Sequence, residues 1–302
     1  MAAALTGIML RTPPPAAWIL PLGVAWSLVI LTIDAASGNT LRQWIPPDQP
    51  IGKDEVATAR GLMLAFVMLP PALLYIHRDK TWRRRSPRAP LYVAGIGAAA
   101  SGVLANGAAF FAGVAAYIIG SFRPQAMLRA IGAIWGLIFA APFLMAAALP
   151  KVPQLLTVSS LPDSVLHRLI IWRTVLDLWA EGRTLTGAGA RATHTLTDRL
   201  GAVTLESGAQ IPLVSSHPHN LPVQLLYEFG LIGYGLVIAF LVMGARALLA
   251  VPWRKEMAIA IAGLLSVVAV YISVEMDFWH LYTWCALSLS VWGLRAIAKD
   301  AG

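Results

Sequence analysis

The chain is poor in cysteine and in charge. It has one cysteine, Cys285, among 302 residues, which excludes a framework of intramolecular disulfides. Charged residues make up 13% of the chain, whereas a soluble domain carries about 25%. Hydrophobic residues make up 58%. This balance excludes an ordinary soluble enzyme and indicates a protein that crosses a membrane several times.

Acidic residues are scarcer than basic ones, which gives a formal net charge of +8. A basic chain can bind nucleic acid, but here the basic residues fall in short segments between apolar runs. These segments are 78–85, 123–129, 246–255 and 295–299. The positive-inside rule places such segments in the cytoplasm. We therefore interpret the basic segments as a signal for membrane topology, and we expect no nucleic-acid partner.

The apolar runs predict about eight transmembrane helices in an all-α, polytopic bundle. Their approximate limits are 17–36, 59–77, 89–105, 107–122, 130–149, 220–245, 257–275 and 278–297. Residues 1–149 would form about five spans, 150–219 a large outer loop, and 220–302 about three spans of one integral membrane domain. Alternation places both termini in the cytoplasm and the loop outside.

The outer loop, 150–219, is the largest predicted extramembrane segment. Apolar residues recur there at helical spacing up to about Ala180. They are Val165, Leu169, Trp172, Leu176 and Trp179. A stripe that contains two tryptophans predicts an amphipathic helix lying on the outer membrane interface.

Polar residues continue from this loop into the span 220–245. Asn220 is a favoured helix cap and Pro222 is tolerated in a first turn, so a helix is expected to begin here. Gln224 and Glu228 follow Asn220 at four-residue steps and form a polar stripe on one helix face. Such a stripe faces protein or water and not lipid, which indicates a functional site at this helix end.

Histidines and arginines give this site its chemistry. His217 and His219 precede the helix, and an imidazole suits proton removal near neutral pH. Guanidinium groups bind phosphate oxygens in pairs and stay charged. The loop supplies Arg168, Arg173, Arg183, Arg191 and Arg199. This combination suits a diphosphate leaving group and an incoming hydroxyl.

Two motifs stand out in this part of the chain. One runs through His217-Pro218-His219-Asn220, Gln224, Glu228, Gly230 and Gly233. The other is Arg168 to Trp172, followed by Gly187-Ala188-Gly189. Both resemble motifs of the O-antigen ligase and O-antigen polymerase family of bacterial membrane proteins. The short predicted spans on either side of Asn106 also fit that family as a hairpin. The resemblance covers roughly residues 55 to 297.

The resemblance implies a type-C glycosyltransferase-like fold in the inner membrane, with the active site facing the periplasm. It implies transfer of a glycan from undecaprenyl diphosphate to a sugar hydroxyl, on lipid A-core for a ligase or on another lipid-linked glycan for a polymerase. No metal, nucleotide or other cofactor is implied. His219 would be the base, Arg168 would bind diphosphate, and His217 would help to shape the site. The remaining candidate substrate-binding residues are Arg173, Asn220, Gln224, Glu228, Asn106 and Arg191.

The sequence departs from the family in two ways. Asn106 stands at the hairpin tip, where the family often has an arginine, and Arg173, Arg183 or Arg191 would have to compensate. The span count is also lower than is usual in the family. These departures leave open a shortened relative that binds without turnover. A transporter is a further alternative, although most spans are almost purely apolar.

Other interpretations concern single residues. A metal site could use His217, His219 and a third ligand from His194, Glu206 or Asp277. Arg168 could extend from an interfacial helix toward water without a functional role. The polar residues at the outer end of the span 257–275, which are Glu275, Asp277 and His280, are interpreted mainly as an ordinary polar span end. The alternative is that they border the site.

Overall fold

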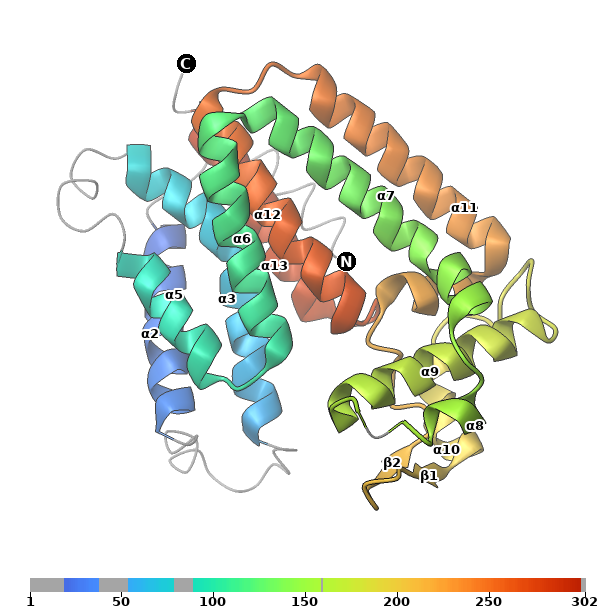
Figure 1. Cartoon of the computed structure of the whole chain (residues 1–302). Coiled ribbons are helices and arrows are strands. Elements are labelled where there is room, and N and C mark those ends of the chain that lie inside the picture. Colours follow the sequence, from blue (N-terminus) through green and yellow to red (C-terminus); the bar gives the residue numbers. More distant parts are fainter. Residues whose placement is uncertain (1–18, 38–53, 79–88, 159, 300–302) are drawn as a thin grey trace. The chain divides into compact units, whose positions relative to one another are not determined.

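The computed structural model describes residues 19–37, 54–78, 89–158 and 160–299, and Figure 1 traces the chain. The predicted cytoplasmic segment 78–85 therefore lies outside the described residues apart from Arg78. The chain divides into two compact units. The first unit comprises Met1–Ile131, Pro252–Tyr271 and Leu281–Gly302, and the second comprises Gly132–Val251 and Ile272–His280.

Each apolar run predicted to span the membrane overlaps a helix, with ends that differ by several residues in some cases. These helices are α2 (Ile19–Ala36), α3 (Asp54–Arg78), α5 (Ala89–Ala100), α6 (Leu104–Phe122), α7 (Pro124–Ala148), α11 (Leu221–Ala250), α12 (Lys255–Val274) and α13 (Leu281–Lys299). Within the described residues, five helices are long and apolar enough to cross a membrane, namely α3, α6, α7, α11 and α12. The helical class is confirmed, and the number of spans stays a prediction.

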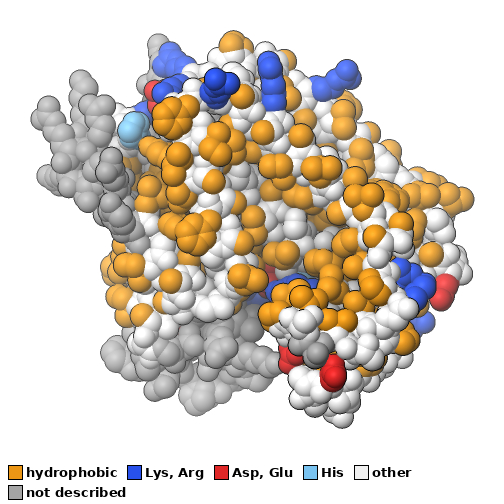
Figure 2. Space-filling model, in the orientation of Figure 1, with side chains coloured by type: hydrophobic (Ala, Val, Ile, Leu, Met, Phe, Trp, Pro, Cys, Tyr) orange, Lys and Arg blue, Asp and Glu red, His pale blue; other side chains and the backbone are white. Residues whose placement is uncertain are grey.

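Large apolar side chains are exposed along these helices. Phe111 and Phe122 of α6, Leu137 of α7, and Phe240 and Met243 of α11 are each more than 60% exposed. Figure 2 shows hydrophobic side chains over much of the surface in view. Apolar exposure of this extent is unfavourable in water and normal against lipid. The helices thus indicate a membrane-embedded protein.

In the first unit, α3 packs against α2, α5, α6 and α13. Its interior holds Pro70 and Pro71. Pro71 lacks an N–H, so the Val67 carbonyl four residues earlier loses its helical hydrogen-bond donor. The hydroxyl oxygen of Ser290, fully buried in α13, lies 3.0 Å from that carbonyl oxygen. The same hydroxyl oxygen lies 2.8 Å from the Ala286 carbonyl oxygen, so its one proton serves two acceptors, one of which is the carbonyl that Pro71 leaves without a helical donor.

Helices α5 and α6 form the predicted hairpin, but its turn lies at Ser101–Val103, where Gly102 has a φ of +62°, and not at Asn106 as predicted. Asn106 lies in the first turn of α6 and is 2% exposed. Its Oδ1 accepts a hydrogen bond from the Tyr271 hydroxyl at 2.9 Å, and its Nδ2 donates to Ser101 Oγ at 3.4 Å. These contacts give Asn106 a structural role within the first unit.

In the second unit, the segment predicted as an outer loop is folded. It contains α8 (Val152–Leu155), α9 (Asp163–Ala180), the 3-10 helix η2 (Ala192–Thr195), α10 (Leu196–Leu200), β1 (Ala202–Thr204) and β2 (Gln210–Pro212). The strands form an antiparallel hairpin in which Val203 pairs with Ile211. Leu155, Leu166, Ile170 and Leu205 form a small apolar core. The hairpin was not predicted because three-residue strands carry too little alternation.

Helix α9 confirms the predicted helix up to Ala180, but its buried face differs from the predicted stripe. Leu166, Ile170 and Val175 are fully or almost fully buried, whereas Val165 and Leu169 are only partly buried. Of the predicted stripe, Leu176 is buried, and the other four members are partly buried. Their orientation toward the membrane interface stays a prediction. The helix packs against α11, which brings it to the polar residues.

Candidate functional site

The first turn of α11 has the predicted cap. Asn220 has extended backbone, and its side-chain oxygen accepts a hydrogen bond from the Val223 N–H at 3.0 Å. Its Nδ2 donates to the Ser273 carbonyl at 3.0 Å. The residue therefore begins α11 and also ties that helix end to Ser273 in the last turn of α12.

The two histidines of the motif differ in their surroundings. His217 is 2% exposed; its Nδ1 lies 3.2 Å from Ser216 Oγ and its Nε2 lies 3.3 Å from the Glu275 carbonyl. Both ring nitrogens are therefore held by neighbouring groups. The His219 side chain is 24% exposed, and its ring centroid lies 4.1 Å from that of His217. His219 is thus the more accessible of the two.

His219 also has an unusual backbone, with a φ of 52°. A non-glycine residue in the left-handed region is uncommon and costs about 1–3 kcal/mol when the surroundings impose it. The next residue, Asn220, is fixed by its cap, and the preceding carbonyl of Pro218 accepts a hydrogen bond from Trp172 Nε1 at 2.8 Å. The loop is therefore held from both sides, and it fixes where the His219 side chain emerges.

Arg168 and His219 meet at one carboxylate. Arg168 Nη2 lies 3.4 Å from Glu275 Oε2, and His219 Nδ1 lies 3.8 Å from the same oxygen. Arg168 Nε also donates to the Val274 carbonyl at 3.3 Å. The arginine motif of α9 and the histidine motif before α11 are about fifty positions apart in the sequence. They are nevertheless side by side in the second unit.

The polar stripe of α11 is fully buried and holds a loop in place. Glu228 Oε2 accepts hydrogen bonds from the Arg191 backbone N–H at 3.1 Å and from Trp279 Nε1 at 2.7 Å. Glu228 Oε1 accepts from the Thr193 hydroxyl and from its N–H. Gln224 Nε2 donates to the same Oε1 at 3.3 Å. With this many donors, Glu228 acts as a fixed acceptor that positions residues 191–193.

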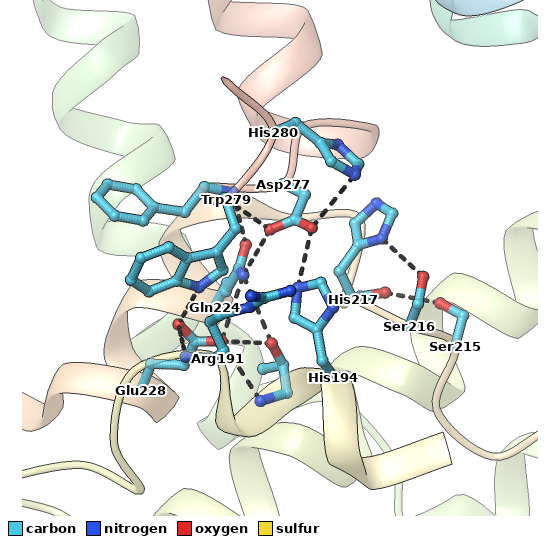
Figure 3. A network of polar contacts seen from close by, with 12 residues as sticks. Arg191, His194, Ser215, Ser216, His217, Gln224, Glu228, Asp277, Trp279 and His280 are labelled. Atoms are coloured by element: carbon cyan, nitrogen blue, oxygen red, sulfur yellow. Dashed lines mark hydrogen bonds and ion pairs between the residues drawn. The ribbon is translucent and has the colours of Figure 1, made fainter. Parts of the chain in front are cut away.

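A second carboxylate, Asp277, lies beside this stripe (Figure 3). Its Oδ1 accepts hydrogen bonds from Gln224 Nε2 at 2.8 Å and from the Trp279 N–H at 3.0 Å. Its Oδ2 lies 3.1 Å from His194 Nε2 and 3.5 Å from His280 Nε2. Asp277 is fully buried, and each of its imidazole partners is 26% exposed. The arrangement places two partly exposed histidines on one buried carboxylate.

The charge state of Asp277 follows from these contacts. Burial by itself raises the pKa of the Asp277 carboxyl, but the hydrogen bonds from Trp279 and Gln224 act in the opposite direction. The nearby charges of His217 and His280 also favour the carboxylate. The pKa of Asp277 therefore lies below its usual value, and the group is a carboxylate at neutral pH.

Two glycines join the loop after α9 to a break in α11. Gly230 has φ 62° and ψ −170°, which only glycine adopts readily, and it interrupts the helix. The Leu231 N–H donates to the Thr184 carbonyl at 2.8 Å. A Cβ on Gly187 would lie 2.5 Å from the Gly230 nitrogen. The loop backbone thus fills the break and takes up the hydrogen-bonding groups that it frees.

Some predicted residues have other roles in the structure. Arg173 is buried, and its guanidinium donates to the Ala146 and Leu149 carbonyls at 3.0 and 2.9 Å and forms an ion pair with Asp177. These contacts tie α9 to the end of α7, and they do not support the predicted substrate contact. Arg191 reaches the network through its backbone N–H, and its side chain is exposed. Asn106 belongs to the first unit.

Other site residues were undervalued or missed. Glu275, Asp277 and His280 were interpreted mainly as an ordinary polar span end, and the structure places all three against the motif residues. Their grouping directly after an apolar run was the available signal. Thr193 and Trp279 carried none, because their roles depend on Glu228, which is distant in sequence.

The metal alternative finds no geometric support in the parts of the chain that the structure describes. Within them, no three side chains of His, Cys, Asp or Glu are placed to share a metal ion. Comparison of the sequence with protein-family models and with curated proteins gives no match, and comparison of the fold with solved structures gives none. The function is therefore inferred from the residues of the site.

Proposed function

We propose that the protein is a membrane glycan transferase of the O-antigen ligase type. It would move a glycan from undecaprenyl diphosphate to a sugar hydroxyl, on lipid A-core, at the periplasmic face of the inner membrane. The observation that carries the proposal is the meeting of Arg168 and His219 at Glu275. A base and a diphosphate-binding cation are the two groups that this reaction requires of a protein.

In the proposed reaction, His219 takes the proton of the acceptor hydroxyl while that oxygen attacks the anomeric carbon of the donor sugar. The bond between this carbon and the diphosphate oxygen breaks, and the lipid diphosphate leaves with the electron pair. Glu275 would stabilise the protonated His219, because an anion close to an imidazole favours the charged form. Arg168 would bind the negative charge that develops on the diphosphate.

The other residues would support this pair. His217 packs against the His219 ring, and Asn220 and Trp172 hold the loop between them. Gln224 and Glu228 hold Asp277 and the loop at Arg191, so they would act as positioning residues. Positioning matters because small displacements of a base from its substrate reduce rates strongly.

The test uses purified protein, an undecaprenyl-diphosphate-linked glycan and lipid A-core, with the product followed by gel mobility. His219→Ala should lower transfer about 10²–10⁴-fold, the usual contribution of a general base. Arg168→Ala should raise the KM for the donor, with little recovery in Arg168→Lys because the bidentate contact is lost.

Near-normal transfer by a folded His219→Ala protein would refute the assigned base. Failure of the wild-type protein to transfer with any lipid-linked glycan would refute the enzyme itself and favour a binding relative. Lengthening of the donor glycan without lipid A-core would assign a polymerase instead.

A further inference from the structure

A cavity of about 550 Å³ lies within the first unit. Its walls are mainly apolar and come from α3, α6 and α12, with one residue from α5. Phe66, Leu73, Phe110, Val114 and Val267 are among the lining residues. The volume falls in the range of about 300–1,000 Å³ that is typical of small-molecule sites. No residue of the proposed catalytic site lines it.

The polar residues of the cavity come from the ends of three helices. His77 is close to the end of α3, Ser121 is close to the end of α6, and Lys255 and Glu256 begin α12. Most of the other lining residues are apolar and lie further from these helix ends, and Tyr117 adds a hydroxyl among them. The cavity therefore has a polar rim at one end and an apolar interior, which is the pattern of a site for an amphiphile.

The length of the cavity matches one leaflet of a bilayer. Its lining extends over residues 66–77 of α3, 110–121 of α6 and 255–267 of α12. At ~1.5 Å rise per residue, each stretch is about 16–18 Å long. Half of the ~30 Å hydrocarbon core of a bilayer is about 15 Å. The cavity can therefore take a lipid chain lying along the helices without reaching the opposite leaflet.

The lining residues Lys255 and Glu256 carry one charge of each sign, and the positive excess at this end comes from two arginines next to the lining in the sequence. Lys255 follows Arg254 directly, and Arg78 follows the lining residue His77. Glu256 is the acidic residue among the lining side chains. The rim also includes the amino end of α12, which favours an anion. An anionic head group fits this rim better than a neutral or zwitterionic one.

We propose that this cavity binds one chain of an anionic phospholipid from the surrounding leaflet, with the phosphate head group at Lys255. The apolar walls remove the acyl chain from the bulk bilayer, and the rim selects the head group by charge. The proposal is independent of glycan transfer, because it rests on the first unit alone.

The first test compares two lipids with identical acyl chains, phosphatidylglycerol and phosphatidylethanolamine. The full-length protein, purified in detergent, is mixed with both and examined by native mass spectrometry. One phosphatidylglycerol molecule should be retained about fivefold better than phosphatidylethanolamine, as expected for one effective charge. Equal retention of the two lipids would overturn the proposal, whatever the variants show.

Two variants locate the binding. Gly263→Leu places a side chain in the cavity, where the Cβ itself would lie an ordinary 3.5 Å from Pro70. It should abolish retention, whereas Gly244→Leu, where nothing lies within 4 Å of the Cβ, should retain the lipid. Lys255→Gln should weaken the phosphatidylglycerol preference about fivefold. Arg246→Gln removes a charge from a residue that does not line the cavity, and it should leave the preference unchanged.

Unchanged retention in Gly263→Leu, or equal loss in Gly244→Leu, would refute the assigned location. Circular dichroism and size exclusion establish that each variant is folded.

Discussion

Gly230→Ala tests whether the break in α11 and the loop that fills it form one unit. An alanine Cβ would lie 2.3 Å from the Leu185 carbonyl oxygen, closer than atoms approach without a backbone shift. The residue would also keep a φ of 62° and a ψ of −170°, and the strain in that region is about 1–3 kcal/mol. The substitution therefore has to displace the loop.

The magnitude follows from the hydrogen bonds that the loop makes with α11. Four backbone hydrogen bonds join the two segments: Ala188 N–H to Tyr227 O, Gly189 N–H to Glu228 O, Leu231 N–H to Thr184 O, and Ile232 N–H to Leu185 O. At about 0.5–1.5 kcal/mol each, their loss with the strain destabilises the protein by about 3–9 kcal/mol. Such a value is exceptional for a single substitution.

The assay is thermal unfolding of detergent-purified protein, combined with limited proteolysis of the loop. The midpoint should fall by about 6 °C or more, and cleavage between residues 184 and 193 should accelerate. Gly235→Ala is the matched control, because nothing lies within 4 Å of a Cβ at that position of the same helix. If Gly230→Ala is as stable and as protease-resistant as Gly235→Ala, the contact between the break in α11 and the loop does not impose the strain assigned to it.

Three further predictions concern stability. Ser290→Ala should lower the free energy of unfolding by about 1–3 kcal/mol in the wild-type background. The loss should be smaller in the Pro71→Ala background, where the restored backbone N–H can bond the Val67 carbonyl. Equal losses in the two backgrounds of this double-mutant cycle would exclude the proposed compensation. Arg173→Ala should lower the unfolding midpoint without changing donor KM, and a selective KM effect would instead restore its substrate role. The lowered pKa of Asp277 stabilises the fold above its unfolded pKa of ~3.9, and this contribution is lost as pH falls through the folded pKa. The difference in thermal-unfolding midpoint between the wild type and Asp277→Asn should therefore become smaller below about pH 4. A difference that does not change with pH would contradict this prediction.

The helices and the start of α11 could be predicted from the sequence because the residues that specify them are close together in the chain. Long apolar runs define the helices that a membrane requires. The Asn220 cap needs only its own side chain and the next three residues, and the structure confirms it. The end of α9 at Ala180 likewise follows from local spacing and a following Gly182. In each case, the interactions that specify the element lie within one or two turns.

Only part of the candidate site could be predicted from the sequence. The preference for His219 over His217 came from the motif, and the burial of His217 supports it. The assignment of Arg173 to substrate binding was not supported. An arginine that binds diphosphate and an arginine that donates to backbone carbonyls look the same in a sequence. Which role applies depends on the end of α7, over twenty residues away along the chain.

By itself, the sequence determined that the chain is helical and apolar enough for a membrane, and that polar groups gather before α11. These properties follow from composition and short-range periodicity. Only the tertiary structure decided that Glu275 lies between Arg168 and His219, that Asp277 receives His194 and His280, and that Gly187 and Gly230 meet. Such pairings depend on how distant segments pack, and a single sequence carries no local signal for them.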